Sequence, residues 1–89
     1  MRSVISVIGK DAVGITAKVS AICAKRNVNI IDITQSVLDD IFAMVMLTEL
    51  PNEKDVVKVL NSDFSELSES TGLEIRVMNE DVFNSMHKI

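Results

Sequence analysis

The sequence predicts an α+β fold: a ferredoxin-like βαββαβ sandwich with a four-stranded antiparallel sheet in the order 4-1-3-2 and a short C-terminal helix. Three observations predict it. Along the 89 residues the hydrophobic period changes from two to about 3.6 and back, twice. The changes fall at turn-forming residues such as Gly9, Asp39-Asp40 and Gly72. Two predicted strands are apolar on both faces, as central strands are, and the other two alternate, as edge strands do.

The first βαβ unit occupies the N-terminal half. Residues 2–8 are short and β-branched, which favours a strand. From Ile15 the apolar residues follow helical spacing. Asp11 is the expected N-cap of this helix, because its carboxylate can accept hydrogen bonds from the first free N–H groups. Residues 29–38 return to period two, and the residues expected on their buried face are Ile31, Ile33 and Val37.

The second half repeats the pattern. Residues 41–50 are a nearly unbroken apolar run, expected at the centre of the sheet. Asn52 is expected to cap a second helix that ends at Gly72. The apolar stripe of this helix is Val56, Leu60, Phe64 and Leu67. Residues 73–78 alternate and predict the fourth strand.

The tail of residues 80–89 is expected to be a docked helix. Its apolar residues recur at helical spacing and are Val82, Phe83, Met86 and Ile89. Such a stripe is too apolar to leave in water, so we expect it on the sheet face opposite the two longer helices or against a second subunit.

Composition excludes several classes of function. The net charge of −4 argues against nucleic acid and anionic membranes, both of which need a basic face. Cys23, the one cysteine, is expected to be a small buried hydrophobe, which predicts no metal site and a reducing cytoplasm. No signal peptide or membrane span is expected. No nucleophile–base pair, carboxylate dyad or phosphate loop can be defended, so we expect no catalytic residue, no cofactor and no enzyme.

One constellation remains, at the two junctions that flank the first helix. Gly14 is expected in the first helical turn, where glycine costs about 1 kcal/mol relative to alanine, so its presence indicates a close approach by backbone or ligand. A helix N-terminus offers free N–H groups to a carboxylate. The structural alternative is that none of these residues binds a ligand: Asp11 only caps the helix, Gly14 only allows close packing, and Asn29 only forms a turn.

These junctions also carry a family resemblance. Gly-Lys-Asp-Ala-Val-Gly-Ile at 9–15 and Asn-Val-Asn-Ile-Ile-Asp-Ile at 27–33 closely resemble the ACT domain, a small regulatory module of amino-acid metabolism. The length, the stretch 29–38 with Gln35, and the ending at 82–89 look like the stand-alone ACT-domain proteins. That group is related to the ACT halves of the glycine cleavage repressor and formyltetrahydrofolate deformylase. On this resemblance residues 1–79 form the ACT domain and residues 80–89 a C-terminal helical tail.

The resemblance implies a homodimer. The strand of residues 29–38 is an expected sheet edge without lysine or proline, which predicts that the dimer pairs through this strand and the helix that begins at Ile15. Ligands, often amino acids, bind in such dimers between the first loop of one subunit and the helix–strand junction of the other. Asp11 matches a residue that contacts the ligand amino group in serine-sensing members, and Asn29 matches an amide from the partner. The implied ligand-binding residues are Lys10, Asp11, Ala12, Gly14, Ile15, Asn29 and Ile30.

Two positions depart from the family pattern. Gly9 stands where serine sensors can have a ligand-binding histidine, and Val13 replaces a usual proline. The expected function is that of a regulatory domain that binds a small molecule, such as an amino acid, and acts as a homodimer on a separate partner enzyme or regulator. The alternative is a structural or protein-interaction module without a ligand.

Overall fold

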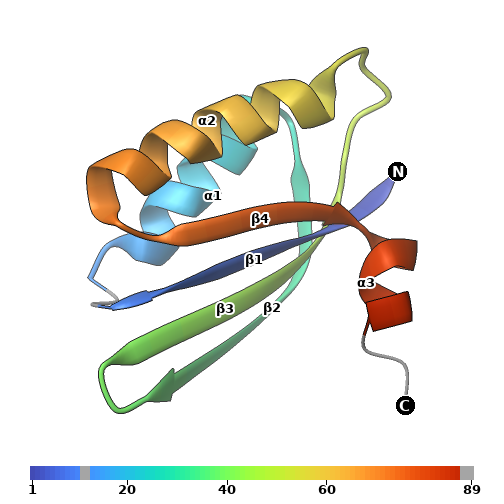
Figure 1. The fold of residues 1–89 in the computed structure, drawn as a ribbon. Helices are drawn as coiled ribbons and strands as arrows, with labels where there is room; N and C mark the ends of the chain where they lie inside the picture. The colour runs from blue at the N-terminus through green and yellow to red at the C-terminus, as the bar shows by residue number, and fades with distance from the viewer. Residues whose placement is uncertain (11–12, 87–89) are drawn as a thin grey trace.

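The computed structural model describes residues 1–10 and 13–86, which form two layers, a sheet and a pair of helices (Figure 1). The elements in chain order are β1 (Arg2–Lys10), α1 (Ile15–Lys25), β2 (Asn29–Leu38), β3 (Ile41–Glu49), α2 (Val56–Thr71), β4 (Glu74–Asn79) and α3 (Glu80–Met86). The strands lie in the order β2-β3-β1-β4, and all neighbours are antiparallel. The predicted ferredoxin-like fold and strand order are therefore confirmed.

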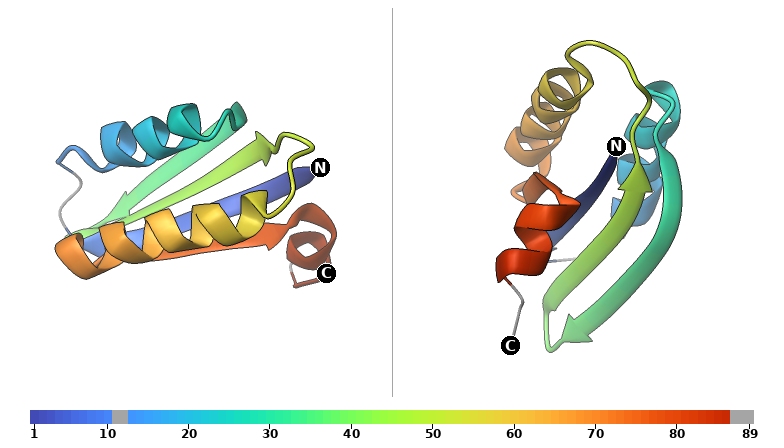
Figure 2. Two further views of the ribbon diagram at one scale, coloured as in Figure 1. Left: turned by 90° about the horizontal axis from the view of Figure 1, so that it is seen from above. Right: turned by 90° about the vertical axis from the view of Figure 1, so that its right-hand side faces the viewer.

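The hydrophobic core lies between the sheet and the layer of α1 and α2, which cover the same face (Figure 2). Its largest fully buried apolar side chains are Phe64, Ile5, Met44, Met46, Leu60, Val7 and Val19. The predicted stripe of α2 is confirmed, because Leu60 and Phe64 are buried and Val56 and Leu67 pack against them. None of the helices in the described part of the chain is long and apolar enough to cross a membrane.

Cys23 lies inside this core on α1 and has no exposed surface. Burial raises the pKa of its thiol to about 11, because the thiolate would lose its hydration there. The thiol therefore stays protonated at neutral pH, and the expectation of a small buried hydrophobe is confirmed.

A β-bulge corrects the predicted faces of β2. The register of β2 against β3 shifts between Ile30 and Asp32, so Ile30 rather than Ile31 packs against the core. Ile31 is 46% exposed, and its expected burial was wrong because counting by twos cannot detect an inserted residue. Ile33 packs on the core as predicted. Val37 is 66% exposed, because the β2–β3 hairpin extends past the helices (Figure 1).

The N-cap predicted for α2 at Asn52 was wrong, and the N-cap position of α1 is Gly14 rather than residue 11. The N-cap of α1 is Gly14, with φ 73°, and that of α2 is Asp55, with φ 63°; neither has a side-chain capping hydrogen bond. In each case the residue before the helix has a left-handed backbone conformation and occupies the N-cap position. The polar residues at 11 and 52 are three positions before these N-caps in the sequence. Asp11 itself lies outside the described residues. Gly72 is the C-cap of α2 with φ 77°, as predicted.

Helices α1 and α2 are joined by a two-pronged ion pair. The Arg26 Nε donates to Asp63 Oδ2 over 2.7 Å, and Arg26 Nη2 donates to Oδ1 over 3.2 Å. These hydrogen bonds hold the pKa of the Asp63 carboxyl below its ordinary value. The unfolded chain therefore binds this proton more readily than the folded chain, so the stabilisation is present above the unfolded pKa of about 3.9 and is lost as the pH falls through the folded pKa.

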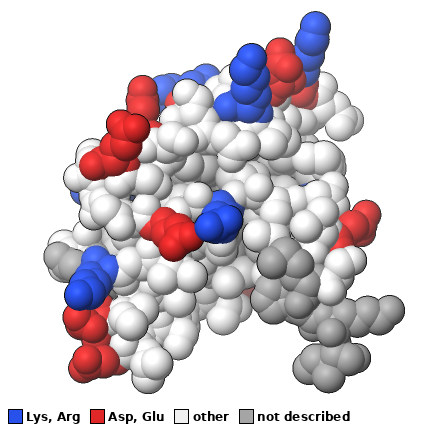
Figure 3. Space-filling view, viewed as in Figure 1, with Lys and Arg blue, Asp and Glu red and all other residues white. Residues whose placement is uncertain are grey.

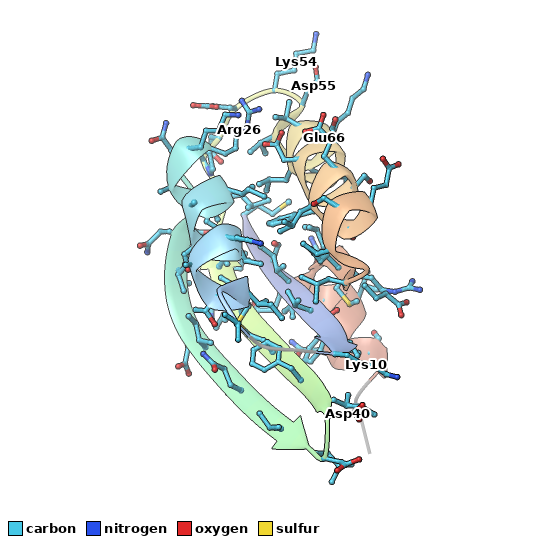
Figure 4. The ribbon with its side chains drawn as sticks, turned by 90° about the vertical axis from the view of Figure 1, so that its left-hand side faces the viewer. Lys10, Arg26, Asp40, Lys54, Asp55 and Glu66 are labelled. Carbon is cyan, nitrogen blue, oxygen red and sulfur yellow. The ribbon has the colours of Figure 1, made fainter. Side chains whose placement is uncertain are left out.

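We expect Asp63→Asn to flatten the acid side of the stability profile. Urea midpoints of the native chain should fall more steeply below pH 4 than those of the variant. The matched control is Glu66→Gln, which removes an exposed carboxylate of the same helix and should keep the native slope (Figure 4). Equal slopes for Asp63→Asn and the native chain would contradict the stabilising role of the ion pair.

Helix α3 packs on β1 and β4, on the sheet face opposite α1 and α2, which we call the open face (Figures 1 and 2). Val4 points to the open face, because its neighbour Ile5 points to the core, yet Val4 is only 3% exposed. In α3 itself Phe83 is half-buried and Val82 is 52% exposed. The expected docking of this helix on the sheet is confirmed; the side chain of Met86 and all of Ile89 lie outside the described residues.

Candidate functional site

The start of α1 is built by the end of β1 and by Gly14. Lys10 closes β1 with its side chain in solvent, and its Nζ lies 3.9 Å from Asp40 Oδ2 of the β2–β3 turn (Figure 4). The left-handed backbone of Gly14 turns the chain into the helix, and its carbonyl accepts a 3.0 Å hydrogen bond from the Lys18 amide. Ile15 is buried and fixes this end of the helix to the core. A glycine is favoured at this φ because no Cβ opposes it.

A cavity of about 200 Å³ lies beside this helix start. Its lining residues are Lys10, Val13, Ile15, Lys18, Thr71 and Leu73. Among the described residues that line it, two are lysines and none is acidic, and the first turn of α1 also carries no acidic side chain. The N-terminal end of a helix adds positive potential. The cavity is therefore suited to a carboxylate or another small anion.

Sequence reasoning missed four of these residues, namely Val13, Lys18, Thr71 and Leu73. Lys18 lies one helical turn after Gly14, so helical spacing could have placed it beside the loop. Thr71 comes from the far end of α2, and its Oγ1 donates to the Leu67 carbonyl over 2.6 Å. No sequence signal links Thr71 to the loop, because only the packing of α2 on the sheet brings the two together.

The structure does not gather all seven predicted ligand-binding residues within one chain. Lys10, Gly14 and Ile15 lie together at the start of α1, whereas Asp11 and Ala12 are outside the described residues. Asn29 is exposed and Ile30 half-buried at the start of β2, beyond the other end of α1. A helix of eleven residues separates the two groups, a length of about 16 Å. The two groups can form one site only across two subunits.

Gly9 has a packing reason to be glycine. A Cβ built on Gly9 would collide with the Leu73 side chain, which is 4% exposed and covers this point of the sheet. A histidine at this position, as serine sensors can have, would require the Leu73 side chain to shift. The departure from the family pattern therefore follows from how this core is packed.

We expect Gly9→Ala to lower the free energy of unfolding by about 1–3 kcal/mol, as overpacking usually does. The matched test is the double variant Gly9→Ala with Leu73→Ala, in which the new methyl group enters the space that leucine leaves. In urea titrations the double variant should lose less than the sum of the two single losses. Additive losses would show that the two positions do not share this space.

With this geometry established, the family can be assigned. The family model for the ACT domain matches residues 2–78. The UPF0237 protein of Clostridium perfringens is 46% identical over 89 residues, which is 100% of both chains. The chain belongs to the ACT-domain family, whose members are generally small-ligand-binding regulatory domains. The resemblance inferred from the loop residues is thereby confirmed.

Two solved structures extend the comparison. An ACT domain protein from Streptococcus pneumoniae superposes with a TM-score of 0.79 at 34% identity, over 93% of this chain and 93% of that chain. A formyltetrahydrofolate deformylase from Pseudomonas putida superposes with a TM-score of 0.80 over 89% of this chain and 29% of the deformylase. At 11% identity the second likeness shows the fold alone.

Proposed function

We propose that the chain is a cytoplasmic, non-catalytic regulatory domain that binds an amino acid and acts as a homodimer on a separate partner enzyme or regulator. The observation that carries this proposal is the cavity at the start of α1, which Lys10 and Lys18 line beside a helix N-terminus whose N-cap residue, Gly14, has no side chain to cap it. Its positive potential fits the ligand carboxylate. In this proposal Asp11 supplies the negative charge for the ligand ammonium, and Ala12, the next residue in the sequence, belongs to the same site.

The proposed dimer pairs β2 with β2 of a second copy. β2 is an edge strand, and its described side chains from Thr34 to Leu38 are all exposed. The Ile33 amide donates to its neighbour Asp32 Oδ1 over 2.9 Å, so it points away from β3. By alternation the amides of Gln35 and Val37 also point outward, free to pair with another strand.

This pairing would complete the ligand site. β2 runs from the far end of α1 back to the β2–β3 turn, and Lys10 and Asp40 place that turn at the same end of the molecule as Gly14 (Figure 4). Antiparallel pairing about the middle of β2 therefore brings the partner subunit's Asn29 and Ile30 toward the start of α1. A ligand held between the subunits would stabilise one arrangement of the dimer, and this coupling is the proposed regulatory signal.

The second candidate function is a protein-interaction module without a ligand. The exposed tip of the β2–β3 hairpin favours it, since Val37 and Leu38 are 66% and 75% exposed. Such a tip can bury apolar surface against another protein. The two candidates differ in whether a small molecule binds at the start of α1.

A thermal-shift panel of the twenty amino acids separates them. A ligand at 100 times its dissociation constant adds about 2.7 kcal/mol, a shift on the order of 10 °C or more for so small a domain. We expect at least one amino acid to raise the melting temperature of the native chain. A flat panel at millimolar concentrations would contradict ligand binding and favour the interaction module.

Matched variants assign the binding site. Lys18→Gln should abolish the ligand-induced shift, because it removes a positive charge from the cavity. Gly14→Ala and Gly72→Ala both place a Cβ at a φ above 70° in uncrowded surroundings, so both should lower stability by about 1 kcal/mol or more. Only the change at Gly14 should also reduce the ligand-induced shift, and equal ligand responses in the two variants would argue against a site at this loop.

A further inference from the structure

The open face of the sheet has an apolar bare end. Ile8 of β1 is 47% exposed, and Ile41 and Val45 of β3 are 45% and 37% exposed. Between their end residues β1 and β3 carry no charged side chain on this face. Figure 3 views this face obliquely and shows a mostly uncharged surface below the charged pair near its centre. Solvent exposure of several neighbouring large apolar side chains marks a surface that is covered in the working assembly.

The charges at the border of the bare end are already compensated. Arg76 Nη2 lies 2.8 Å from Glu74 Oε1 on β4, and Lys10 is within ion-pair distance of Asp40. If a partner covered this face, each of these four charges would keep its counter-ion. Burial of an unpaired charge, which is the costly case, would therefore not arise for them.

The face is stepped rather than flat. α3 rises from the end of the sheet where Val4 is buried, and at the opposite end a hollow of about 530 Å³ opens. The lining residues of the hollow are Ile8, Gly9, Lys10, Ile41, Thr71, Gly72 and Glu74. α3 itself exposes the apolar side chain of Val82. The open face thus has a projection at one end and borders a hollow at the other, where β1 meets the connection between α2 and β4.

We propose that a second copy of this chain packs on the open face, related by a two-fold axis that lies between the two sheets and perpendicular to their strands. This axis reverses the strand direction, so α3 of each copy enters the hollow at the bare end of the other. Val82 of one copy then covers Ile8 and Ile41 of the other, and Val45 lies near the centre of the interface. Such an interface is isologous, as closed dimers require.

The available area supports this occupant. Strands of six to ten residues at the usual rise and spacing give the whole sheet face about 540 Å², of which α3 already covers the end at Val4. A stable interface needs roughly 800 Å² from each partner. The sheet alone falls short, and insertion of α3 into the hollow adds the missing area. The arrangement leaves the outer edge of β2 free, so it combines with pairing through β2 to give a tetramer.

Sedimentation of the full chain at tens of micromolar tests this proposal. Val45→Lys at the centre of the open face and Val82→Lys on α3 should each halve the native mass. The matched control is Ser65→Lys, an exposed position on α2, which should keep the native mass. Circular dichroism verifies that each variant folds. If Val45→Lys does not fold, Val82→Lys decides the outcome. Native mass in folded Val82→Lys and Val45→Lys would overturn the proposal.

A charge pair tests the two-fold arrangement itself. Ile8→Lys and Val82→Glu should each halve the mass, and the double variant should regain it, because the axis brings position 82 of one copy to position 8 of the other. A double variant that stays dissociated would overturn this arrangement. Loss of pairing through β2, measured separately with Gln35→Pro, bears only on the proposed function.

Discussion

Gln35→Pro is expected to halve the mass of the native assembly with little loss of stability. The amide of Gln35 points away from β3, so proline removes a donor that only a second copy of β2 would use. The internal ladder between β2 and β3 keeps all its hydrogen bonds. Sedimentation velocity on the native chain and the variant at equal concentration measures the change.

Ser36→Pro is the matched control for this effect. Its amide points toward β3, because Leu38 and Ile41 flank the two-residue turn as a hydrogen-bonded pair and bonded pairs recur every second residue. Proline there should lower the free energy of unfolding through a broken internal ladder. Pairing through β2 would be refuted by a native chain that is monomeric at tens of micromolar, or by an unchanged mass in folded Gln35→Pro.

Truncation after Glu80 is expected to lower the free energy of unfolding by about 3 kcal/mol. Removing the rest of α3 uncovers Val4, now 3% exposed, and takes away the half-buried Phe83. Burial of one such side chain contributes about 1.5–3 kcal/mol. This is a large fraction of the 5–15 kcal/mol that stabilises a typical domain.

Urea unfolding of the truncated and full chains measures the loss. Truncation after Glu80 keeps the ion pair between Arg2 and Glu80, whose atoms lie 3.3 Å apart, so a change reports apolar burial. Asn84→Ser is the control, since it keeps α3 and alters an exposed polar side chain. An unchanged midpoint in the truncated chain would mean that α3 adds nothing to the domain.

The fold could be predicted because each element follows one hydrophobic period between clear turns. The α2 stripe at Leu60 and Phe64 and the stop at Gly72 are local signals, and the structure has both. The β-bulge at Ile31 and the left-handed residues Gly14 and Asp55 could not be predicted. The bulge inserts one residue into the strand and the left-handed residues redirect the backbone, and neither leaves a signal in the hydrophobic pattern.

The candidate site was predictable only in part for a similar reason. The loop after β1 is a contiguous motif, and the family resemblance places Lys10 and Gly14 in it. Lys18 and Thr71 join the cavity through helix geometry and tertiary packing. Asn29 lies beyond the opposite end of α1, so no single chain can show it in the site.

The most direct test of the proposed ligand site is a two-dimensional ¹H–¹⁵N NMR titration of the native chain with an equimolar mixture of the twenty amino acids. A site at the start of α1 predicts shifts of the Gly14 and Lys18 amides, together with Asn29 and Ile30 across the subunit contact, while the Gly72 amide stays in place. A spectrum that does not change at millimolar concentrations, or shifts confined to residues away from Gly14 and Lys18, would contradict the proposal.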